Sequence, residues 1–386
     1  MKLRYLKYYL LILVALLTVT SCQEDEQFIQ EEPRTFYTKE KAFKTVSEVE
    51  SAIVSLYSQV RYMEVNGSYA AHRQGQGTDI LTVPQLRISS SFSDYSIVSP
   101  RHWAFFNIYQ DFYNLISKAN NILSVIQEGN INWPSESDKA YAVAQAKFFR
   151  AYAYRNLGEL YGGVPIVKEF INTPRYDFQR ASMLETYQVA INDLVDALDD
   201  LPEITEVPGG RVNKAAAQHY LSQLYLDKGI WMEQQGESAG QMYDSSIYYA
   251  NQVIEDSKFE LMTERFGTRA DEPDKSVYWD LFRKGNVSYD AGNTECIWNF
   301  QADQAAWEEA DGGSYVGFPR SHMPVIRWMD GYQLDPNHIS GRGVAFVAPT
   351  MYLRDSIWGM QQDHLTSGSI AQGDMRNADH NIVRQF

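Results

Sequence analysis

The sequence predicts a mainly α-helical fold, with paired helices from residue 38 to 257 and a more irregular lobe after them. Apolar residues recur at helical spacing through most of the first region, and helix-start signatures precede several of these runs. After Lys258 the apolar runs become short and are separated by Gly, Pro and Asp, which indicates loops and short strands. With 386 residues and 44% hydrophobic content, the chain can bury a large core, in one elaborate domain or in two closely packed lobes.

Residues 1–21 are typical of a signal peptide. A basic start precedes an apolar run from Tyr8 to Leu17, which is too short to cross a hydrocarbon core about 30 Å thick. Small residues then lead to Cys22, a pattern that resembles the lipobox of bacterial lipoproteins, and the acidic residues after it resemble the export tag of surface-displayed lipoproteins. We therefore predict a lipid anchor at Cys22 and an acylated tether over residues 22–37. The alternative is an ordinary secretory signal with Cys22 near its cleavage site.

The charge of the chain excludes one class of partner. Asp and Glu outnumber Lys and Arg by 49 to 34, which gives a formal net charge of −15, and no local basic cluster compensates for it. Such a surface repels phosphate backbones, so we expect no nucleic-acid partner. Cys22 and Cys296 are the only cysteines. With Cys22 acylated, Cys296 has no partner in the chain, and we expect it to be a small buried apolar residue.

The first helix is predicted from the capping-box pattern of residues 47–50 to about Tyr62. Residues 64–102 then show no sustained helical period, and their Gly, Pro and Ser residues predict an inserted loop. Loops of this length are usually functional or disordered, and the aromatic and charged residues of this one favour a function. Its candidate ligand-binding residues are Tyr69, Arg73, Asp79 and Tyr95. An ion pair within the loop is an equally good explanation of Arg73 and Asp79.

Further helices follow in the same region. The helix that starts at Trp103 ends at about Gln127, and the helix that starts at Ser135 stops at Gly162-Gly163. The next helix begins with a capping box at Ser182. Another ends at Gly229, and apolar residues at helical spacing include Leu160, Ile247 and Ile254. The predicted starts are Trp103, Ser135, Ser182, Asn213 and Asp244.

One stretch carries a repeat signature. Tyr154-x-x-Leu157-Gly158-x-x-Tyr161 matches the core of the tetratricopeptide pattern, with Tyr in place of its usual Trp. Small residues in such repeats let paired helices approach closely, while aromatic residues fill the gaps between them. The helix starts do not follow a regular repeat of about 34 residues. We therefore predict divergent tetratricopeptide-like helical pairs interrupted by the inserted loop.

Residues 258–386 are predicted to form the irregular lobe, with short strands at residues 295–300 and 344–348. The chain stops at Phe386 in an apolar segment without a polar tail, which predicts a lobe that is truncated at its C-terminus.

Aromatic residues in loops can stack on the apolar face of a sugar ring, whereas those in regular elements are usually core. In the second region, the aromatic residues in glycine-rich or polar surroundings are Trp307, Tyr315 and Trp328, and we add them to the ligand-binding candidates. The aromatic residues that we expect in the core are Trp103, Tyr154, Tyr161 and Trp298.

Sequence motifs of metal sites and of common hydrolases are absent. The chain has no H-E-x-x-H, C-x-x-C, G-x-S-x-G, P-loop or G-x-G-x-x-G pattern, and its seven histidines lack ligand spacing. Glu308, Glu309 and Asp311 could supply the carboxylate pair of a glycosidase, but neighbours in sequence rarely reach that geometry, and a solvated acidic loop is favoured. We predict that the protein is not an enzyme, and we expect no catalytic residue, no metal site and no cofactor.

Short motifs stand in a fixed order along the chain, at residues Ala146–Tyr152, Leu160–Pro165, Gly210–Ala217, Leu224–Leu226, Tyr248–Ile254 and Asp374–Arg376. Each motif alone is unspecific, but the ordered set, together with the acidic-flanked Cys22, resembles the SusD/RagB family of outer-membrane nutrient-binding lipoproteins. The similarity covers essentially the whole chain after the signal peptide.

The resemblance implies a surface-exposed lipoprotein of the cell outer membrane that sits as a lid on a SusC-type TonB-dependent transporter and touches its barrel through the helical repeats. Family members bind glycans, or oligopeptides in the RagB-like branch, without converting them. We expect oligosaccharide binding and delivery to the transporter. The alternatives are an oligopeptide ligand, or a helical-repeat envelope adaptor that binds no ligand. Ligand residues vary across the family, so none carries over by motif.

Overall fold

Helices make up most of the residues that the computed structural model describes, which are 43–65, 78–82, 99, 102–129, 131–273, 275–283, 285–301 and 348–357. The long helices among them are α3 (Val46–Val65), α5 (Trp103–Gln127), α6 (Glu136–Tyr161), α7 (Met183–Ala197), α8 (Lys214–Gln234) and α9 (Gly240–Ile254). The short elements are η3 (Leu198–Asp200), η4 (Ile204–Glu206), α10 (Val277–Asp280), η5 (Tyr289–Ala291) and the π-helical η7 (Tyr352–Ile357). Residues 1–44 and 45–386 are separate units, and all these elements lie in the second.

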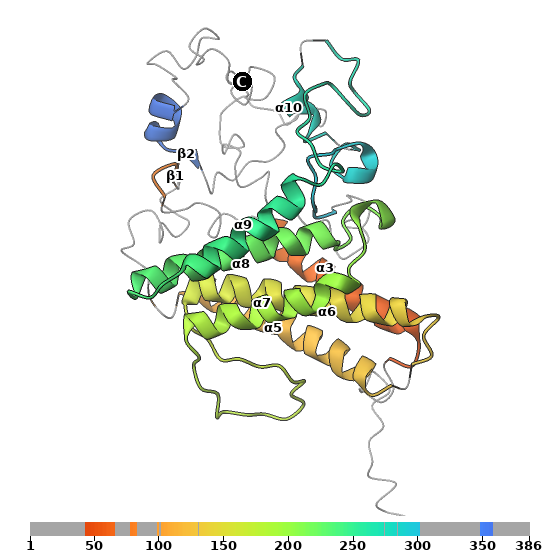
Figure 1. Cartoon of the computed structure of the whole chain (residues 1–386), viewed down its shortest axis with the longest axis vertical. Coiled ribbons are helices and arrows are strands. Elements are labelled where there is room, and N and C mark those ends of the chain that lie inside the picture. Colours follow the sequence, from red (N-terminus) through yellow and green to blue (C-terminus); the bar gives the residue numbers. More distant parts are fainter. Residues whose placement is uncertain are drawn as a thin grey trace, which may run out of the picture. The chain divides into compact units, whose positions relative to one another are not determined.

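Consecutive long helices pack side by side (Figure 1): α5 on α6, α6 on α7, α7 on α8 and α8 on α9, while α3 packs on both α5 and α6. The core lies between them. Ile53, Phe112, Phe149, Ile191 and Leu221, one from each of five helices, are between 0% and 1% exposed. Burial of each such side chain contributes about 1.5–3 kcal/mol. The predicted mainly α-helical fold is confirmed. No helix in the described ranges has the length and apolar character needed to cross a bilayer.

Side-chain caps fix the starts of several helices where the sequence predicted them. Ser135 and Asn213 each accept a hydrogen bond of 3.0 Å from the backbone N–H three residues later. Ser182 and Glu185 form the expected reciprocal capping box. These caps matter because the first turn of a helix leaves its N–H groups without partners inside the helix.

The bounds of three helices differ from the prediction. Thr45 rather than Ser47 caps α3, because the Glu48 N–H donates to Thr45 Oγ1 (3.3 Å) and the Thr45 N–H donates to the Glu48 carboxylate (2.8 Å). Two overlapping Ser/Thr-x-x-Glu patterns were available, and the earlier one gives the longer helix. The helix α9 starts at Gly240 instead of Asp244, and α8 continues past Gly229 to Gln234.

Glycines let two pairs of neighbouring helices approach closely. A Cβ atom on Gly158 of α6 would lie 2.7 Å from Tyr187 Cε1 of α7, and a Cβ atom on Gly229 of α8 would lie 2.7 Å from Tyr243 Cε1 of α9. In both α6 and α8, a tyrosine stands four residues before the glycine. The α6–α7 and α8–α9 pairs therefore share one packing arrangement, which agrees with the tetratricopeptide-like signature.

Some of the apolar residues at helical spacing are exposed. Leu160, in the last turn of α6, is 42% exposed, and Ile247 and Ile254 of α9 are 58% and 74% exposed. Among the described elements, α9 packs mainly on α8, so only one side of it is covered by another helix. Helical spacing identifies an apolar stripe, but the number of neighbouring elements decides how much of it is buried.

The strand expected at residues 295–300 does not form, because this segment makes its contacts with loops and helices through Ile297 and Trp298 rather than with another strand. Of the strand expected at residues 344–348, only Ala348 is described, and it belongs to strand β2 (Ala348–Pro349). Strand β2 pairs antiparallel with β1 (Leu81–Thr82), with Leu81 opposite Pro349.

Candidate functional site

The inserted loop is tied to the second region at Asp79, the one loop candidate that the described ranges include. The Thr350 hydroxyl donates a hydrogen bond to the Asp79 carbonyl, and the Thr350 N–H donates one to the Ile80 carbonyl (2.9 Å). The Asp79 side chain is exposed. With the β1–β2 pairing, these bonds hold two segments together that are separated by about two thirds of the chain.

The other candidates lie outside the described residues, so their predicted role stays a prediction. They are the ligand-binding candidates Tyr69, Arg73, Tyr95, Trp307, Tyr315 and Trp328, the lipid-anchor candidate Cys22, and the acidic cluster Glu308, Glu309 and Asp311. Of the aromatic residues expected in the core, Tyr154 is fully buried, while Tyr161 and Trp298 are partly buried.

The motif Ala146–Tyr152 holds helices together. Arg150 donates to both carboxylate oxygens of Asp193 on α7, at 2.7 and 2.6 Å, and to Asn120 Oδ1 on α5 at 2.8 Å. The two ionised side chains are only 8% and 6% exposed. A buried bidentate pair of this kind fixes the register of three helices and leaves Arg150 unavailable to a ligand.

The motif Leu160–Pro165 forms the turn after α6. Gly162 has a positive φ of 73°, a conformation that glycine adopts without strain, and a Cβ atom on Gly163 would lie 1.9 Å from the Ala181 carbonyl oxygen. The Tyr113 hydroxyl of α5 donates to the Pro165 carbonyl at 2.6 Å. This motif also serves the fold.

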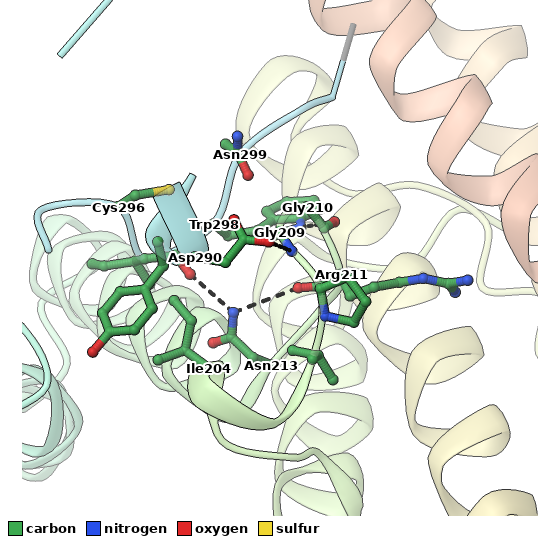
Figure 2. Close-up of a pocket in the computed structure, with 13 residues that line it drawn as sticks. Ile204, Gly209, Gly210, Arg211, Asn213, Asp290, Cys296, Trp298 and Asn299 are labelled. Carbon is green, nitrogen blue, oxygen red and sulfur yellow. Dashed lines mark hydrogen bonds between the residues drawn. The ribbon is translucent and has the colours of Figure 1, made fainter. Parts of the chain in front are cut away.

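The motif Gly210–Ala217 joins the helices to the segment 295–301. Asn213 caps α8 with its side-chain oxygen and donates from its Nδ2 to the Ile297 carbonyl at 2.9 Å. Trp298 Nε1 donates to the Gly210 carbonyl at 2.9 Å, and a Cβ atom on Gly210 would lie 2.5 Å from Gln301 Cγ. Figure 2 shows Asn213 between the loop and this segment, with the Arg211 side chain pointing away from them.

Trp298 is the centre of an aromatic cluster between this segment and the helices. Its ring centroid lies 5.2 Å from that of Phe148 and 6.3 Å from that of Tyr220, in edge-to-face geometry, and 4.9 Å from that of Phe300. Edge-to-face pairs stabilise by about 0.5–1.5 kcal/mol beyond the area they bury. Trp298 is therefore a packing residue.

The crevice drawn in Figure 2 is too small for a ligand. Its volume is about 10 Å³, which is close to the minimum that one water molecule needs. Cys296 lines it, and burial raises the pKa of the Cys296 thiol to about 11. The thiol is therefore protonated at neutral pH and is not an activated nucleophile. No group of His, Cys, Asp and Glu within the described ranges could hold a metal ion.

A wider groove of about 340 Å³ adjoins the crevice, and its lining includes Tyr57, Arg61, Arg211, Asn299 and Phe300. Volumes above about 300 Å³ are typical of small-molecule sites. The groove offers aromatic rings beside guanidinium and amide groups, a combination that suits a ligand with both apolar and hydroxyl-bearing faces.

Hydrogen bonds hold the groove's side chains in place. The Tyr57 hydroxyl donates to Gln145 Oε1 (2.7 Å) and accepts from the Val212 N–H (3.0 Å). Burial raises the pKa of Tyr57 to about 12, so the hydroxyl stays protonated. Arg211 pairs with Glu50, and its guanidinium lies 5.2 Å from the centre of the Tyr57 ring.

Sequence reasoning did not identify this groove. A signal was present, because Val54, Tyr57, Ser58 and Arg61 follow helical spacing on a face of α3 that mixes apolar and polar residues. The rest of the lining comes from segments far away in the sequence, which no local pattern connects.

The comparisons with known proteins agree with this fold. Residues 28–226 match the SusD-like family described as starch-binding and associating with the outer membrane. A SusD-like protein from Bacteroides ovatus is 25% identical over 232 residues, which are 59% of this chain and 40% of that protein. SusD-like protein P25 from Formosa agariphila is 25% identical over 321 residues, which are 80% of this chain and 55% of that protein. The chain thus spans about half the length of these curated relatives.

A solved structure shows the same fold. The crystal structure of a SusD-like protein from Bacteroides fragilis superposes with a TM-score of 0.59, at 21% sequence identity, and covers 81% of this chain and 52% of that protein. The family match extends over residues 28–226 of 386, which is more than half of the chain. With the helical pairs and the ordered motifs, this match shows that the chain belongs to the SusD-like family.

Proposed function

We propose that this protein is a surface-exposed lipoprotein of the outer membrane that binds oligosaccharides and delivers them to a SusC-type TonB-dependent transporter. The observation that carries the proposal is the match of residues 28–226 to a family described as starch-binding and associating with the outer membrane. Cys22 would supply the lipid anchor, and residues 22–37 the acylated tether.

Capture would occur without chemical conversion. Loop aromatics would stack on the apolar faces of sugar rings, and a few polar groups would select the geometry of the hydroxyls. The proposed ligand residues are those of the inserted loop, Tyr69, Arg73, Asp79 and Tyr95, and those of the second region, Trp307, Tyr315 and Trp328. In support, the β1–β2 pairing and the bonds of Thr350 join the inserted loop to the second region at Asp79.

Domain organisation is part of the proposal. Residues 38–257 would be the helical-repeat region that contacts the transporter, with residues 64–102 inserted, and residues 258–386 would be the irregular lobe. The transporter is proposed as the partner because the family is described as associating with the outer membrane.

Isothermal titration calorimetry tests the ligand class. The chain with Cys22→Ser, which keeps it soluble, would be titrated with a panel of soluble oligosaccharides that includes maltoheptaose, and with oligopeptides of similar length. We expect heat from at least one oligosaccharide and none from the peptides. Heat from peptides alone would replace the ligand class with the oligopeptide alternative. Silence with both would favour an envelope adaptor.

A further inference from the structure

A polar pocket of about 310 Å³ lies between the start of α8 and the end of α9, and none of the candidates discussed so far is among the residues that line it. Lys214 and Gln218 reach it from α8, and Asn251 and Gln252 reach it from the last turn of α9. All the residues that line it belong to the described part of the chain. Its volume is at the lower end of the range of about 300–1,000 Å³ that is typical of small-molecule sites.

Four of the five charged side chains that line the pocket are paired with one another. Lys258 Nζ lies 2.8 Å from Asp256 Oδ2 and 3.4 Å from Glu203 Oε2, and Lys214 Nζ lies 3.9 Å from Glu203 Oε1. Both lysines therefore have carboxylate partners already, and the pocket does not need an ionic ligand. Glu255 adds an exposed carboxylate that can accept hydrogen bonds.

Three residues with side-chain amides line the pocket. Gln218 is only 9% exposed as a residue, and its side-chain amide lines the pocket. Asn251 and Gln252 are exposed at the rim. A molecule in the pocket that can donate and accept hydrogen bonds can replace the water that reaches these amides.

Tyrosines continue the site along the helix pair. The rings of Tyr225 and Tyr249 are stacked, with centroids 5.7 Å apart and planes at 7°, and the Tyr248 ring lies 5.1 Å from that of Tyr249. Tyr248 is 58% exposed and precedes the two rim amides by three and four residues, so all three share one face of α9. Tyr225 lies two turns from Gln218 along α8, about 10 Å away.

We infer that this surface, Gln218, Asn251, Gln252 and Tyr248, is a second saccharide-binding subsite for a neutral oligosaccharide. A sugar hydroxyl both donates and accepts, which matches an amide beside a carboxylate, and a sugar ring offers an apolar C–H face to an exposed tyrosine. Tyr248 stands one helical turn before the rim amides, so one ring on the tyrosine and a linked ring in the pocket can belong to the same oligosaccharide. The inference rests on the proposed function because it assumes the same class of ligand, but it uses none of the loop residues.

Hydrogen exchange and calorimetry on a pair of matched variants test the subsite. The test variant is Asn251→Ala with Gln252→Ala, since both residues are exposed and caps and core stay intact. The control is Gln241→Ala, which removes an exposed amide from the first turn of α9, far from the pocket. The probes are the oligosaccharides of the panel above, with maltoheptaose first, and all chains carry Cys22→Ser.

We expect an oligosaccharide to slow amide exchange in the first turns of α8 and the last turn of α9. In the double variant this protection disappears, and the affinity for the same oligosaccharide falls about ten-fold, because two hydrogen-bonding amides are lost. The control should match the unchanged chain. A second comparison uses neighbours of equal exposure: Tyr248→Ala should weaken binding, whereas Ile247→Ala should not, although each residue is 58% exposed.

The outcomes separate the two proposals. If an oligosaccharide binds with the same affinity to the unchanged chain and the double variant, and neither helix end is protected, the subsite is overturned while the proposed function stands. If no oligosaccharide binds to the unchanged chain, the proposed function and the subsite are both overturned.

Discussion

Asp193 and Asp196 lie on the same helix, α7, and each pairs with a base on α6, yet the two ion pairs differ in burial. The Asp193 side chain is 6% exposed and binds Arg150, whereas the Asp196 side chain is 61% exposed and binds Lys147 at 3.2 Å. Screening by water makes an exposed pair weak, whereas a buried pair leaves an uncompensated charge when one partner is removed.

We therefore predict that Asp193→Ala lowers the free energy of unfolding by about 3–5 kcal/mol, since it leaves Arg150 buried without its carboxylate. The matched change Asp196→Ala should cost about 1 kcal/mol or less. Urea unfolding followed by circular dichroism measures both. Equal losses for the two variants would contradict the role assigned to the buried pair.

Cys296 gives a second prediction at this scale, based on pH. Burial raises the pKa of its thiol from 9.0 to about 11, so unfolding increases the thiolate fraction at pH 8 by about a hundredfold. In the Cys22→Ser chain, where Cys296 is the only thiol, labelling with a disulfide reagent at pH 8 should be slow in the native state and fast in urea. Because the folded pKa is the higher one, the thiol's contribution to stability is complete below pH 9 and is lost as the pH rises towards 11. Native labelling as fast as in urea would show that the thiol is not shielded.

At the scale of elements, the helical pairs depend on glycines at their contacts. Capping residues and the Tyr-x-x-Leu-Gly-x-x-Tyr pattern predicted the helices well, because both signals are local in the sequence. The prediction failed at residues 295–300, whose apolar alternation resembles a strand. There Trp298 and the carbonyl of Ile297 bind the loop before α8, a contact between distant segments that no local pattern encodes.

Gly158→Ala tests the close contact of α6 and α7. The added methyl would lie 2.7 Å from the Tyr187 ring, which is buried and has little room to move, so we expect a loss of about 1–3 kcal/mol. Gly240→Ala, at the start of α9 with nothing within 4 Å of the added methyl, should be neutral or slightly stabilising. Thermal unfolding of both variants measures the difference. A neutral Gly158→Ala would refute the proposed contact.

At the scale of the whole molecule, sequence and structure contribute different parts of the site. The sequence predicted the fold, the lipid anchor and the family, and the last is shown by the family match. It missed the groove beside Tyr57 and the pocket at Gln218, since each is assembled from elements far apart in the chain. Aromatic and charged composition predicts which loops suit a ligand, whereas cavities between packed helices follow only from the tertiary arrangement.

The proposed lipid anchor at Cys22 gives a prediction for the intact cell. Cys22→Ser should move the protein from the membrane fraction to the soluble fraction, because acyl chains supply the membrane affinity. Oligosaccharide uptake should then fall, while binding by the purified protein stays unchanged, since the role proposed for the anchor is to keep the protein near a transporter. Fractionation and uptake of labelled oligosaccharide measure these effects. Loss of binding by the soluble form would mean that Cys22 has a role in the ligand site.

Asn213 couples the local unfolding of two distant parts of the chain, the start of α8 and the segment around Ile297. Its oxygen caps the first turn of α8, and its amide nitrogen holds the carbonyl of Ile297, 84 residues away. If the segment around Ile297 lifts off, the carboxamide loses its restraint and the helix start loses its cap. Local unfolding of one therefore promotes local unfolding of the other, and the two segments behave as one cooperative unit with a shared free energy of opening.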